Sequence, residues 1–409
     1  MESKNIRLNV QYGCLQGSYW ILAAISSAFL TPLLKVMGFS YTEIGTIIAV
    51  KYLSAIVAQV FYSWFADKYA DRFQLKNIIG VIALASLVAT VFFMKCPLGY
   101  GGTVVLFAVF GATLNCIQPL VDSLSARYAN DGKDVHYNIA RGVGSLTWAL
   151  TCAYSGTFAD RYGTENILYL QIGAVFLVMV LAFSMMRIQG KLEKEEKRGS
   201  FENTGEGVHS FGYLFLKFPK YRTFLFSAAF GIMCFNFSST FLIDLIENLG
   251  GTNVHYGISE FVLAIAEIPT ALCFLKLRKR FSIDQLLLCC MFFNMLKALA
   301  MTWAPNVVLL IASMLFEMLG MGLYYASLVY FVMENLPAGD VVKGVTLVNV
   351  AANGVGASIS TYFSGVILEA FGMRALMYTG VFMGIISTLL IAKNIVSDKG
   401  TIKRAVEGI

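Results

Sequence analysis

Two apolar stretches between residues 115 and 150 carry an acid, a base and an indole. Asp122 lies in the first stretch, and Arg141 and Trp148 lie in the second. A charged side chain inside a run long enough to cross a bilayer is costly unless it faces water or an opposite charge. Arg141 and Trp148 are seven residues apart, so an α-helix would place them about 20° from eclipsed and roughly 10 Å apart. One helix face would then offer a fork of hydrogen-bond donors and a flat ring.

These residue types suit a polar solute that contains a ring. A planar guanidinium binds vicinal hydroxyls or a carboxylate through two parallel hydrogen bonds. An indole presents an apolar plate to the C–H face of a sugar or to another flat solute. The alternative is an ion pair that joins two helices beside an interfacial tryptophan, although pairing alone seldom offsets the burial of both charges. We therefore expect a solute site around Asp122, Arg141 and Trp148.

The composition indicates an all-α membrane protein. Of 409 residues, 57% are hydrophobic and only 14% are charged, whereas soluble domains carry about 25% charged residues. A hydrocarbon core of about 30 Å needs about 20 apolar residues per helix. Continuous apolar runs favour helices over a barrel, whose strands alternate. Twelve segments qualify, near residues 12–37, 43–66, 77–95, 101–125, 138–158, 167–186, 223–245, 254–277, 285–304, 307–333, 341–368 and 373–395.

The two halves of the chain repeat each other. Residues 140–145 recur as residues 352–357, and residues 154–163 recur in the same order as residues 363–372. Two such matches indicate a duplicated half, as in transporters built from parallel repeats. Asn353 is then the counterpart of Arg141, and we include Asn353 among the substrate contacts. The predicted divisions are a first six-helix bundle at 1–186, a linker with an interfacial helix at 187–222, a second bundle at 223–395 and a tail at 396–409.

The basic residues predict the orientation. Of the 31 Lys and Arg residues, 24 fall in segments that a cytoplasmic amino terminus would place inside, 4 fall outside and 3 fall within helices. We expect a multi-pass protein of the cell (inner) membrane with both termini in the cytoplasm. The net charge of +6 is then an orientation signal with affinity for anionic headgroups, not for nucleic acid. Neither the eight scattered cysteines nor any other motif predicts a metal, a cofactor or an enzyme.

Residues 115–122 and 139–150 resemble the sugar-binding fourth and fifth helices of the oligosaccharide:proton symporters, the lactose permease family of the major facilitator superfamily. This resemblance implies a major facilitator fold with two pseudo-symmetric bundles. It implies that Asp122 and Arg141 bind the sugar while Trp148 stacks on it, and we include Gln118 of the same motif among the substrate contacts. Further similar positions are Gly45, Gln59, Asp67, Lys68, Phe218, Pro219, Lys220, Glu267 with the following Ile-Pro-Thr-Ala, and Phe316 with Glu317.

The resemblance also implies a proton pathway. Glu267 would link sugar to proton, and Glu317, next to Lys297, would take the proton. The chain has Met314 where the family has a histidine, and its three histidines all fall in predicted loops, so a carboxylate must carry the proton. If Lys297 and Glu317 pair, they resemble a proton relay. The alternative is a static salt bridge between helices.

Two further groups of charges have predicted roles. Lys51 lies eight residues beyond Glu43, too deep to reach either surface easily, so we expect it to face the cavity and contact the substrate. The charges that follow the second helix resemble a superfamily loop whose ion pairs hold the cytoplasmic side shut. These gating residues are Asp67, Lys68, Asp71 and Arg72.

The leading hypothesis is proton-coupled uptake of a sugar or small glycoside by alternating access. The proton is the coupling ion, and the expected partners are the solute, the proton and the bilayer, with the protein as a monomer. A nucleoside or small organic anion is the nearest alternative, favoured by Lys51, Arg141 and Lys297. A membrane sensor or scaffold, which needs no site for a proton, is the alternative of another class.

Overall fold

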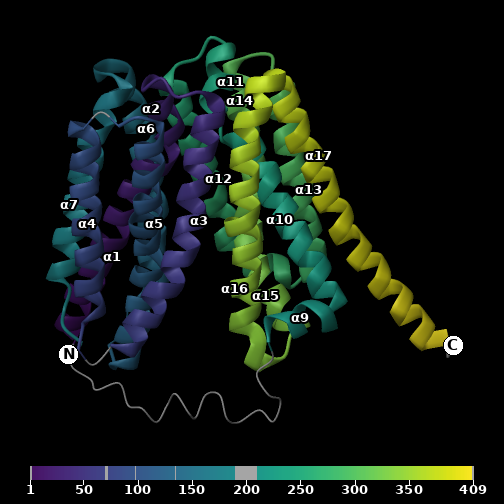
Figure 1. The fold of residues 1–409 in the computed structure, drawn as a ribbon. Helices are drawn as coiled ribbons and strands as arrows, with labels where there is room; N and C mark the ends of the chain where they lie inside the picture. Colours follow the sequence, from purple (N-terminus) through teal and green to yellow (C-terminus); the bar gives the residue numbers. More distant parts are fainter. Residues whose placement is uncertain (1, 70–71, 97, 134, 189–209, 408–409) are drawn as a thin grey trace. The chain divides into compact units, whose positions relative to one another are not determined.

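The computed structural model describes residues 2–69, 72–96, 98–133, 135–188 and 210–407, and helices dominate this part of the chain (Figure 1). Each of the twelve predicted segments is mainly helical, although turns at residues 29, 240–241 and 319–320 interrupt three of them. The α-helices are α1 (Glu2–Ala23), α2 (Leu30–Val36), α3 (Tyr41–Lys68), α4 (Leu75–Lys95), α5 (Tyr100–Asn130), α6 (Tyr137–Tyr162), α7 (Ile167–Ser184), α9 (Phe211–Lys217), α10 (Pro219–Ser239), α11 (Leu242–Asn248), α12 (Asn253–Arg278), α13 (Ile283–Thr302), α14 (Val307–Ser313), α15 (Met321–Asn335), α16 (Val341–Asn349) and α17 (Ala357–Glu407).

Shorter turns of other helix types interrupt this series. The 3₁₀ turns are η2 (Thr164–Asn166), η3 (Met314–Met318) and η4 (Ala338–Asp340), and the π-helices are η1 (Ala24–Ala28) and η5 (Val350–Gly356). Short π-helical segments occur often at functional sites. η1 follows α1 directly, and η5 lies between α16 and α17. Both interruptions fall inside predicted membrane-spanning segments.

The helices are long and apolar enough for a multi-pass membrane protein. By length and hydropathy, 8 of the described helices could cross a membrane, or up to 10 if each of two bent pairs counts as one span. α17 contains a break at Gly372, whose φ of 80° is rarely adopted by other residues. This break falls between the eleventh and twelfth predicted segments. The total of twelve spans stays a prediction.

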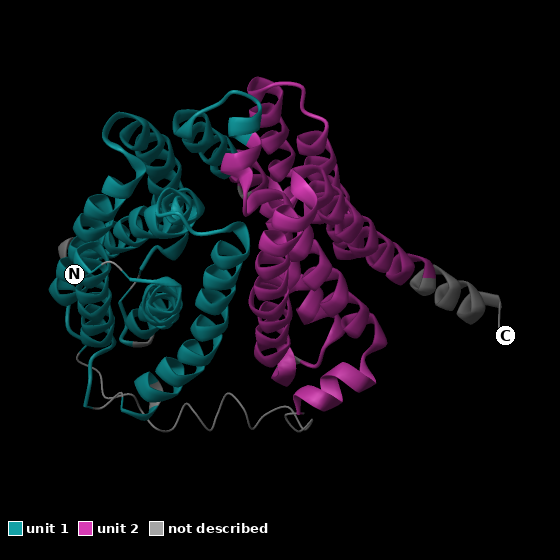
Figure 2. Cartoon of the chain, turned by 45° about the horizontal axis from the view of Figure 1, so that its top comes forward, with its two compact units in different colours: residues 1–195, 246–265 teal, residues 196–245, 266–409 magenta. Residues whose placement is uncertain are grey.

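The chain forms two compact units (Figure 2). The first unit comprises residues 1–195 and 246–265, and the second comprises residues 196–245 and 266–409. Residues 189–209 of the predicted linker lie outside the described residues. The segment predicted to form an interfacial helix contains α9, where the Ser210 hydroxyl caps the helix by accepting a hydrogen bond from the Tyr213 N–H; its place at the membrane surface stays a prediction.

Glycines allow the closest helix contacts of the first unit. α3 packs on α5 at Gly111, where an added Cβ would lie 2.0 Å from the Lys51 carbonyl oxygen. α6 meets the start of α12 at Gly156, where a Cβ would lie 2.3 Å from the Asn253 carbonyl oxygen. Helices in membranes pack tightly where small residues let backbones approach. This contact with α12 is one reason why residues 246–265 belong to the first unit.

The second unit is built around the packing of α10 on α17, with α13 against both. Two buried serines, Ser227 of α10 and Ser387 of α17, form hydrogen bonds between these helices. The Ser227 hydroxyl bonds to the Ser387 carbonyl at 2.8 Å, and the Ser387 hydroxyl bonds to the Ser227 carbonyl at 2.7 Å. Hydroxyl groups that bond across helices are satisfied without water. The polar atoms therefore fix how these two helices align.

Candidate functional site

Asp122 on α5 is held by two neutral amides in the first unit. Its Oδ1 accepts hydrogen bonds from Gln16 Nε2 at 2.8 Å and from Gln118 Nε2 at 3.0 Å. Gln118 lies one turn earlier on α5, whereas Gln16 comes from α1 and is completely buried. Gln16 Nε2 also donates to the Tyr12 hydroxyl at 3.0 Å. The Tyr137 hydroxyl of α6 also donates to Asp122, and the positive charge of Arg141 acts on it, so neutral donors orient the carboxylate beside a cation.

Arg141 and Trp148 on α6 are joined by a third residue, Trp20 of α1. The Arg141 guanidinium lies 3.9 Å from the centre of the Trp20 ring, a cation–π contact. Trp20 and Trp148 pack edge to face at 5.7 Å between ring centres. Trp20 lies against the α6 backbone because Gly144 leaves room: a Cβ there would lie 2.3 Å from Trp20 Cδ1. The Trp20 ring thus contacts both Arg141 and Trp148 and connects the two predicted site residues.

The charges of this group have no ionic partner. Within the part of the chain that the structure describes, neither Asp122 nor Arg141 forms an ion pair, although each contributes to the electrostatic surroundings of nearby groups. Three buried atoms of their neighbours also have no hydrogen-bond partner there, namely Gln16 Oε1, Gln118 Oε1 and Trp20 Nε1. Buried polar atoms normally find partners. This group can therefore form further hydrogen bonds, both as donor and as acceptor.

Lys51 occupies a different place, in the interior of the first unit. Only 3% of its surface is exposed, and its Nζ donates to the Ser26 carbonyl at 2.9 Å and to Ser27 Oγ at 3.3 Å. Both serines belong to the π-helix η1. A small cavity of about 10 Å³ lies beside it and is lined partly by Phe93 and Phe107. None of these contacts involves Asp122 or Arg141, so the substrate contact of Lys51 stays a prediction.

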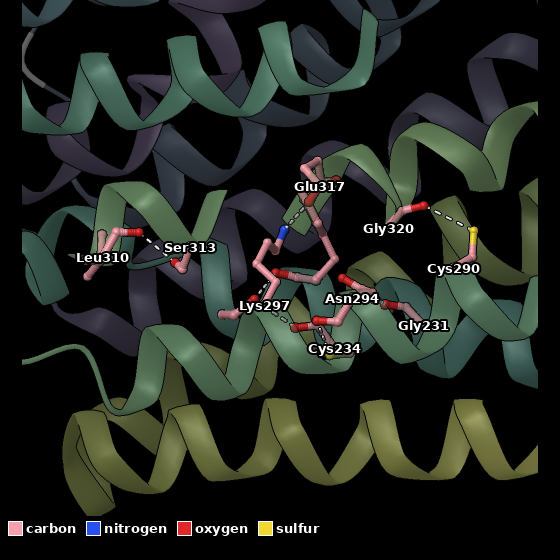
Figure 3. A network of polar contacts seen from close by, with 11 residues as sticks. Gly231, Cys234, Cys290, Asn294, Lys297, Leu310, Ser313, Glu317 and Gly320 are labelled. Carbon is pink, nitrogen blue, oxygen red and sulfur yellow. Dashed lines mark hydrogen bonds and ion pairs between the residues drawn. The ribbon is translucent and has the colours of Figure 1, made fainter. Parts of the chain in front are cut away.

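Lys297 of α13 and Glu317 of η3 form a buried ion pair in the second unit (Figure 3). Lys297 Nζ lies 2.6 Å from Glu317 Oε2, and the two side chains are 0% and 1% exposed. The same ammonium lies 4.2 Å from the centre of the Phe235 ring. The other carboxylate oxygen, Oε1, has no hydrogen-bond partner among the described residues. The pairing that the sequence left open is therefore present, and it uses only one of the two carboxylate oxygens.

Irregular backbone positions Glu317. The 3₁₀ turn η3 ends at Met318, and α15 begins only after Gly320. Carbonyl groups freed by this break are bonded from neighbouring helices: Thr270 of α12 donates to the Met318 carbonyl, and Cys290 Sγ of α13 donates to the Gly320 carbonyl at 3.1 Å. Non-helical backbone at membrane depth needs such partners. Side chains of α12 and α13 thus fix the backbone of the segment that carries Glu317.

Glu267 lies near this pair, whereas Asn353 belongs to another segment. A Cβ added at Gly322 would lie 3.2 Å from the Glu267 Cα and 3.2 Å from the Glu317 carbonyl oxygen. α12 therefore approaches the Glu317 segment at Glu267. Asn353 lies in the π-helix η5, and its Nδ2 donates to Asn349 Oδ1 at 3.1 Å. The predicted roles of both residues stay predictions.

The predicted gating charges follow the end of α3. Lys68, the last residue of α3, places its Nζ 4.6 Å from the centre of the Trp64 ring. Asp71 and the side chain of Asp67 lie outside what the structure describes, and no ion pair of Arg72 occurs among the described residues. The gate therefore stays a prediction.

The sequence does not decide whether Gln16 and Trp20 face a cavity or serve packing and interfacial anchoring, although both stand out in the first apolar segment. A spacing of four residues from Tyr12 to Gln16 to Trp20 places all three on one face of α1. Polar groups recurring at this spacing inside an apolar helix are the signal that could have identified them. Packing or interfacial anchoring explains the same pattern equally well, so only the contacts with Asp122 and Arg141 separate the two explanations.

An all-helical membrane chain in two units, each with buried charges, has the architecture of a transporter with the major facilitator fold. The sequence matches the family described as MFS_1 like family over residues 14–379, so the chain belongs to that family. Membership confirms the superfamily and points to a transporter rather than an enzyme. It does not single out the lactose permease family. No curated protein sequence shows a significant match.

Solved structures of transporters share the fold. A mutant of the nucleoside transporter NupG has a TM-score of 0.78 at 13% identity, covering 95% of this chain and 99% of that one. A bacterial homologue of the human lysosomal transporter Spinster has a TM-score of 0.68 at 12% identity, covering 98% of both chains. The POT family transporter PepTSo has a TM-score of 0.67 at 11% identity, covering 95% of this chain and 98% of its own. At these identities the likeness establishes the fold alone.

Proposed function

We propose that the protein is a proton-coupled secondary transporter that takes up a small solute with vicinal hydroxyl groups, of the sugar or glycoside class, by alternating access. One observation carries this proposal: Asp122 of α5 and Arg141 of α6 both contact α1, where Gln16 donates to the carboxylate and Trp20 stacks on the guanidinium, and the two charges do not close into a salt bridge. A carboxylate accepts hydrogen bonds from hydroxyl groups, and a guanidinium donates two in parallel. The indole of Trp148 or Trp20 offers an apolar plate to the C–H face of the ring.

The neighbours of the two charges support a hydroxylated solute. The side-chain amides of Gln16 and Gln118 donate hydrogen bonds to Asp122, and their Oε1 atoms remain available as acceptors. The Trp20 Nε1 remains as a donor. A sugar offers both donors and acceptors around one ring, so it can satisfy this mixed set. A purely anionic solute would meet Asp122 as a like charge.

Glu317 is the proposed proton carrier. One of its carboxylate oxygens faces Lys297, and the other has no partner among the described residues. A proton on Glu317 would cancel the charge that Lys297 faces and weaken the link between α13 and η3. The proton would thereby change how firmly two helices of the second unit are held together. In this proposal the protein acts as a monomer in the cell membrane with cytoplasmic termini, as its basic residues predict.

A nucleoside is the second candidate, favoured by the structural likeness to the nucleoside transporter NupG over 95% of this chain. The ribose of a nucleoside carries vicinal hydroxyls that suit Arg141. Its flat base suits the two tryptophans, whose rings pack edge to face at 5.7 Å. The same residues would therefore serve either class, and a direct comparison of solutes must separate them.

The test begins with purified protein and a thermal-shift screen of mono- and disaccharides, nucleosides and aromatic acids. Solutes that stabilise the protein are then measured for uptake into proteoliposomes that are alkaline inside. We expect a sugar to accumulate with a matching proton influx, and Arg141→Gln to abolish its binding. Arg374→Gln, which removes an exposed arginine, is the control. If only nucleosides accumulate, the solute is a nucleoside and not a sugar. Binding of a solute without any transport would indicate a sensor.

Glu317→Gln tests the proton step. The variant is expected to lose accumulation driven by the pH gradient while retaining solute exchange across a membrane without a gradient. Because the substitution leaves Lys297 without its counter-charge, the double variant Lys297→Met/Glu317→Gln serves if the single variant unfolds. Glu165→Gln, at an exposed carboxylate, is the matched control. Accumulation that survives in both Glu317 variants would exclude this residue as the carrier.

A further inference from the structure

A groove of about 1010 Å³ runs along α1, where this helix meets α6 and α7. Its floor is the contact between α1 and α6, where the Thr147 hydroxyl donates to the Gly17 carbonyl at 3.0 Å. Neither Asp122 nor Arg141 lines the groove. On α6, the groove residue Val143 lies about 200° around the helix from Arg141. The groove is therefore separate from the proposed solute site.

Small residues make this groove deep. Gly13 and Cys14 of α1 lie along it, and a Cβ added at Gly13 would meet no atom within 4 Å. Its walls are long aliphatic side chains with large exposed fractions, such as Val10 at 60% and Ile139 at 67%. If α6 spans the membrane beside α1 and α7, as its apolar segment predicts, such walls are solvated by hydrocarbon chains rather than by water. The body of the groove thus suits an acyl chain.

One end of the groove is polar and basic. Asn9 and His136 line it, and the His136 backbone N–H donates to Asn9 Oδ1 at 2.7 Å. The His136 ring is exposed and has no hydrogen bond to another described residue. Two exposed arginines belong to the same end of the helices: Arg7 follows the lining residue Ile6, and Arg187 follows the end of α7. Such positions favour an anionic group at the membrane surface.

We propose that this groove binds an anionic phospholipid of the surrounding bilayer. An acyl chain lies along Gly13, Cys14 and Gly17, and the phosphate lies at the end formed by Asn9 and His136, beside Arg7. The lipid lies against the α1–α6 contact, on a side of α6 different from the one that carries Arg141. A neutral lipid, a detergent or another protein would satisfy the apolar walls without using the basic end, and the test separates these occupants.

The first experiment fills the groove. Wild type and Gly13→Phe are reconstituted with phosphatidylglycerol or phosphatidylcholine, extracted in mild detergent and examined by native mass spectrometry. Wild type is expected to retain phosphatidylglycerol at least fivefold more than phosphatidylcholine, and Gly13→Phe is expected to lose that excess. The control is Gly173→Phe, since Gly173 of α7 is exposed and its Cβ would also meet nothing within 4 Å. Equal retention by all three proteins, or of both lipids, overturns the proposal.

The second experiment uses the unmodified protein. Cys14 is an exposed thiol in the groove, whereas Cys273 is an exposed thiol elsewhere on the chain. Delipidated protein is treated with a membrane-permeant maleimide, and the modification of each cysteine is followed by peptide mass spectrometry. Added phosphatidylglycerol is expected to slow labelling of Cys14 at least fivefold and to leave Cys273 unchanged. Protection of both thiols, or of neither, overturns the proposal.

Discussion

The two units hold their charged residues in opposite ways, since Asp122 and Arg141 are half-buried whereas Lys297 and Glu317 are fully buried. In the first unit, Asp122 and Arg141 rest on amides and an indole. In the second unit, Lys297 and Glu317 face each other at 2.6 Å with almost no exposure. Neutral partners can be exchanged for the hydroxyl groups of a solute with little electrostatic cost, whereas a dry ion pair separates readily only when one charge is neutralised. The first arrangement suits a cargo and the second suits a proton.

Breaking the ion pair should have the largest effect on stability. Lys297→Met leaves Glu317 buried without a counter-charge, which is expected to destabilise the protein by about 3–5 kcal/mol. The double variant Lys297→Met/Glu317→Gln removes both charges and is expected to recover most of the loss. Thermal unfolding of the three proteins in one detergent at pH 8 measures this. Equal melting temperatures of the single and double variants would show that the pair contributes no such coupling.

The corresponding change in the first unit should affect binding far more than stability. Arg141→Lys keeps the charge but loses the planar fork and its stacking on Trp20. Loss of charge-assisted hydrogen bonds worth about 1.5–3 kcal/mol should weaken solute affinity roughly 10- to 100-fold. Titration calorimetry with the best solute from the screen measures it, with Arg374→Lys as the control. A variant that binds normally but melts much earlier would place Arg141 among the structural residues.

Adding one methyl group at Gly144 tests whether the position of Trp20 matters for solute binding. Gly144→Ala would place a Cβ 2.3 Å from Trp20 Cδ1, so the ring must move. Overpacking of this kind is expected to cost about 1–3 kcal/mol and to lower solute affinity, because Arg141 loses its stacking partner. The matched control is Gly142→Ala on the same helix, where a Cβ meets nothing within 4 Å. If both variants bind and unfold like wild type, the Trp20 contact has no role in the site.

The smallest expected effect is a pH dependence at the end of α6. Burial opposes ionisation of Asp160, but hydrogen bonds from Thr252, Asn253 and Val254 outweigh it and hold the pKa of the carboxyl below its ordinary value. A lowered folded-state pKa stabilises the protein above the unfolded value of about 4 and ceases to do so as pH falls through the folded value. Because Asp160 is mostly exposed, this contribution is small.

Asp160→Asn removes the ionisable group at this helix start. Its melting temperature should therefore fall less than that of wild type between pH 6 and pH 3. Asp160 caps the start of α12 within the first unit, where its negative charge also interacts favourably with the helix dipole. Identical pH profiles for the two proteins would show that the hydrogen bonds do not favour the ionised form. The result gives a baseline for a carboxylate that stays charged, against which Glu317 can be compared.

Hydropathy and helical spacing predicted much of this arrangement. Long apolar runs locate the helices because each must satisfy its own backbone in the bilayer. The seven-residue spacing placed Arg141 and Trp148 on one face of α6. The ring between them could not be predicted, because it depends on how Gly144 meets a residue of another helix. The pairing of Lys297 with Glu317 was one of two open possibilities, since sequence gives no distance between separate helices.

The π-helical and 3₁₀ turns could not be predicted from the sequence either. η1 and η3 are as apolar as the helices that they interrupt, so hydropathy carries no mark of them. Each is accompanied by side chains from other helices that bond to its carbonyl groups: Lys51 for η1, and Thr270 and Cys290 for η3 and the residues after it. These partners are tens of residues away in the chain. Only the folded arrangement decides which carbonyl groups are free to accept a hydrogen bond.

The additional residue in the π-helix η1 determines which side of α1 faces the rest of the first unit. A π-helical turn closes hydrogen bonds one residue later than an α-helical turn, so it accommodates one additional residue. Deleting one residue from Ala24–Ala28 would turn the preceding helix by about 100° relative to everything after it. The edge of α1 that carries Gln16 and Trp20 would then point away from Asp122 and Arg141. Homologues that lack this additional residue are expected to need different residues on α1 to complete the same site.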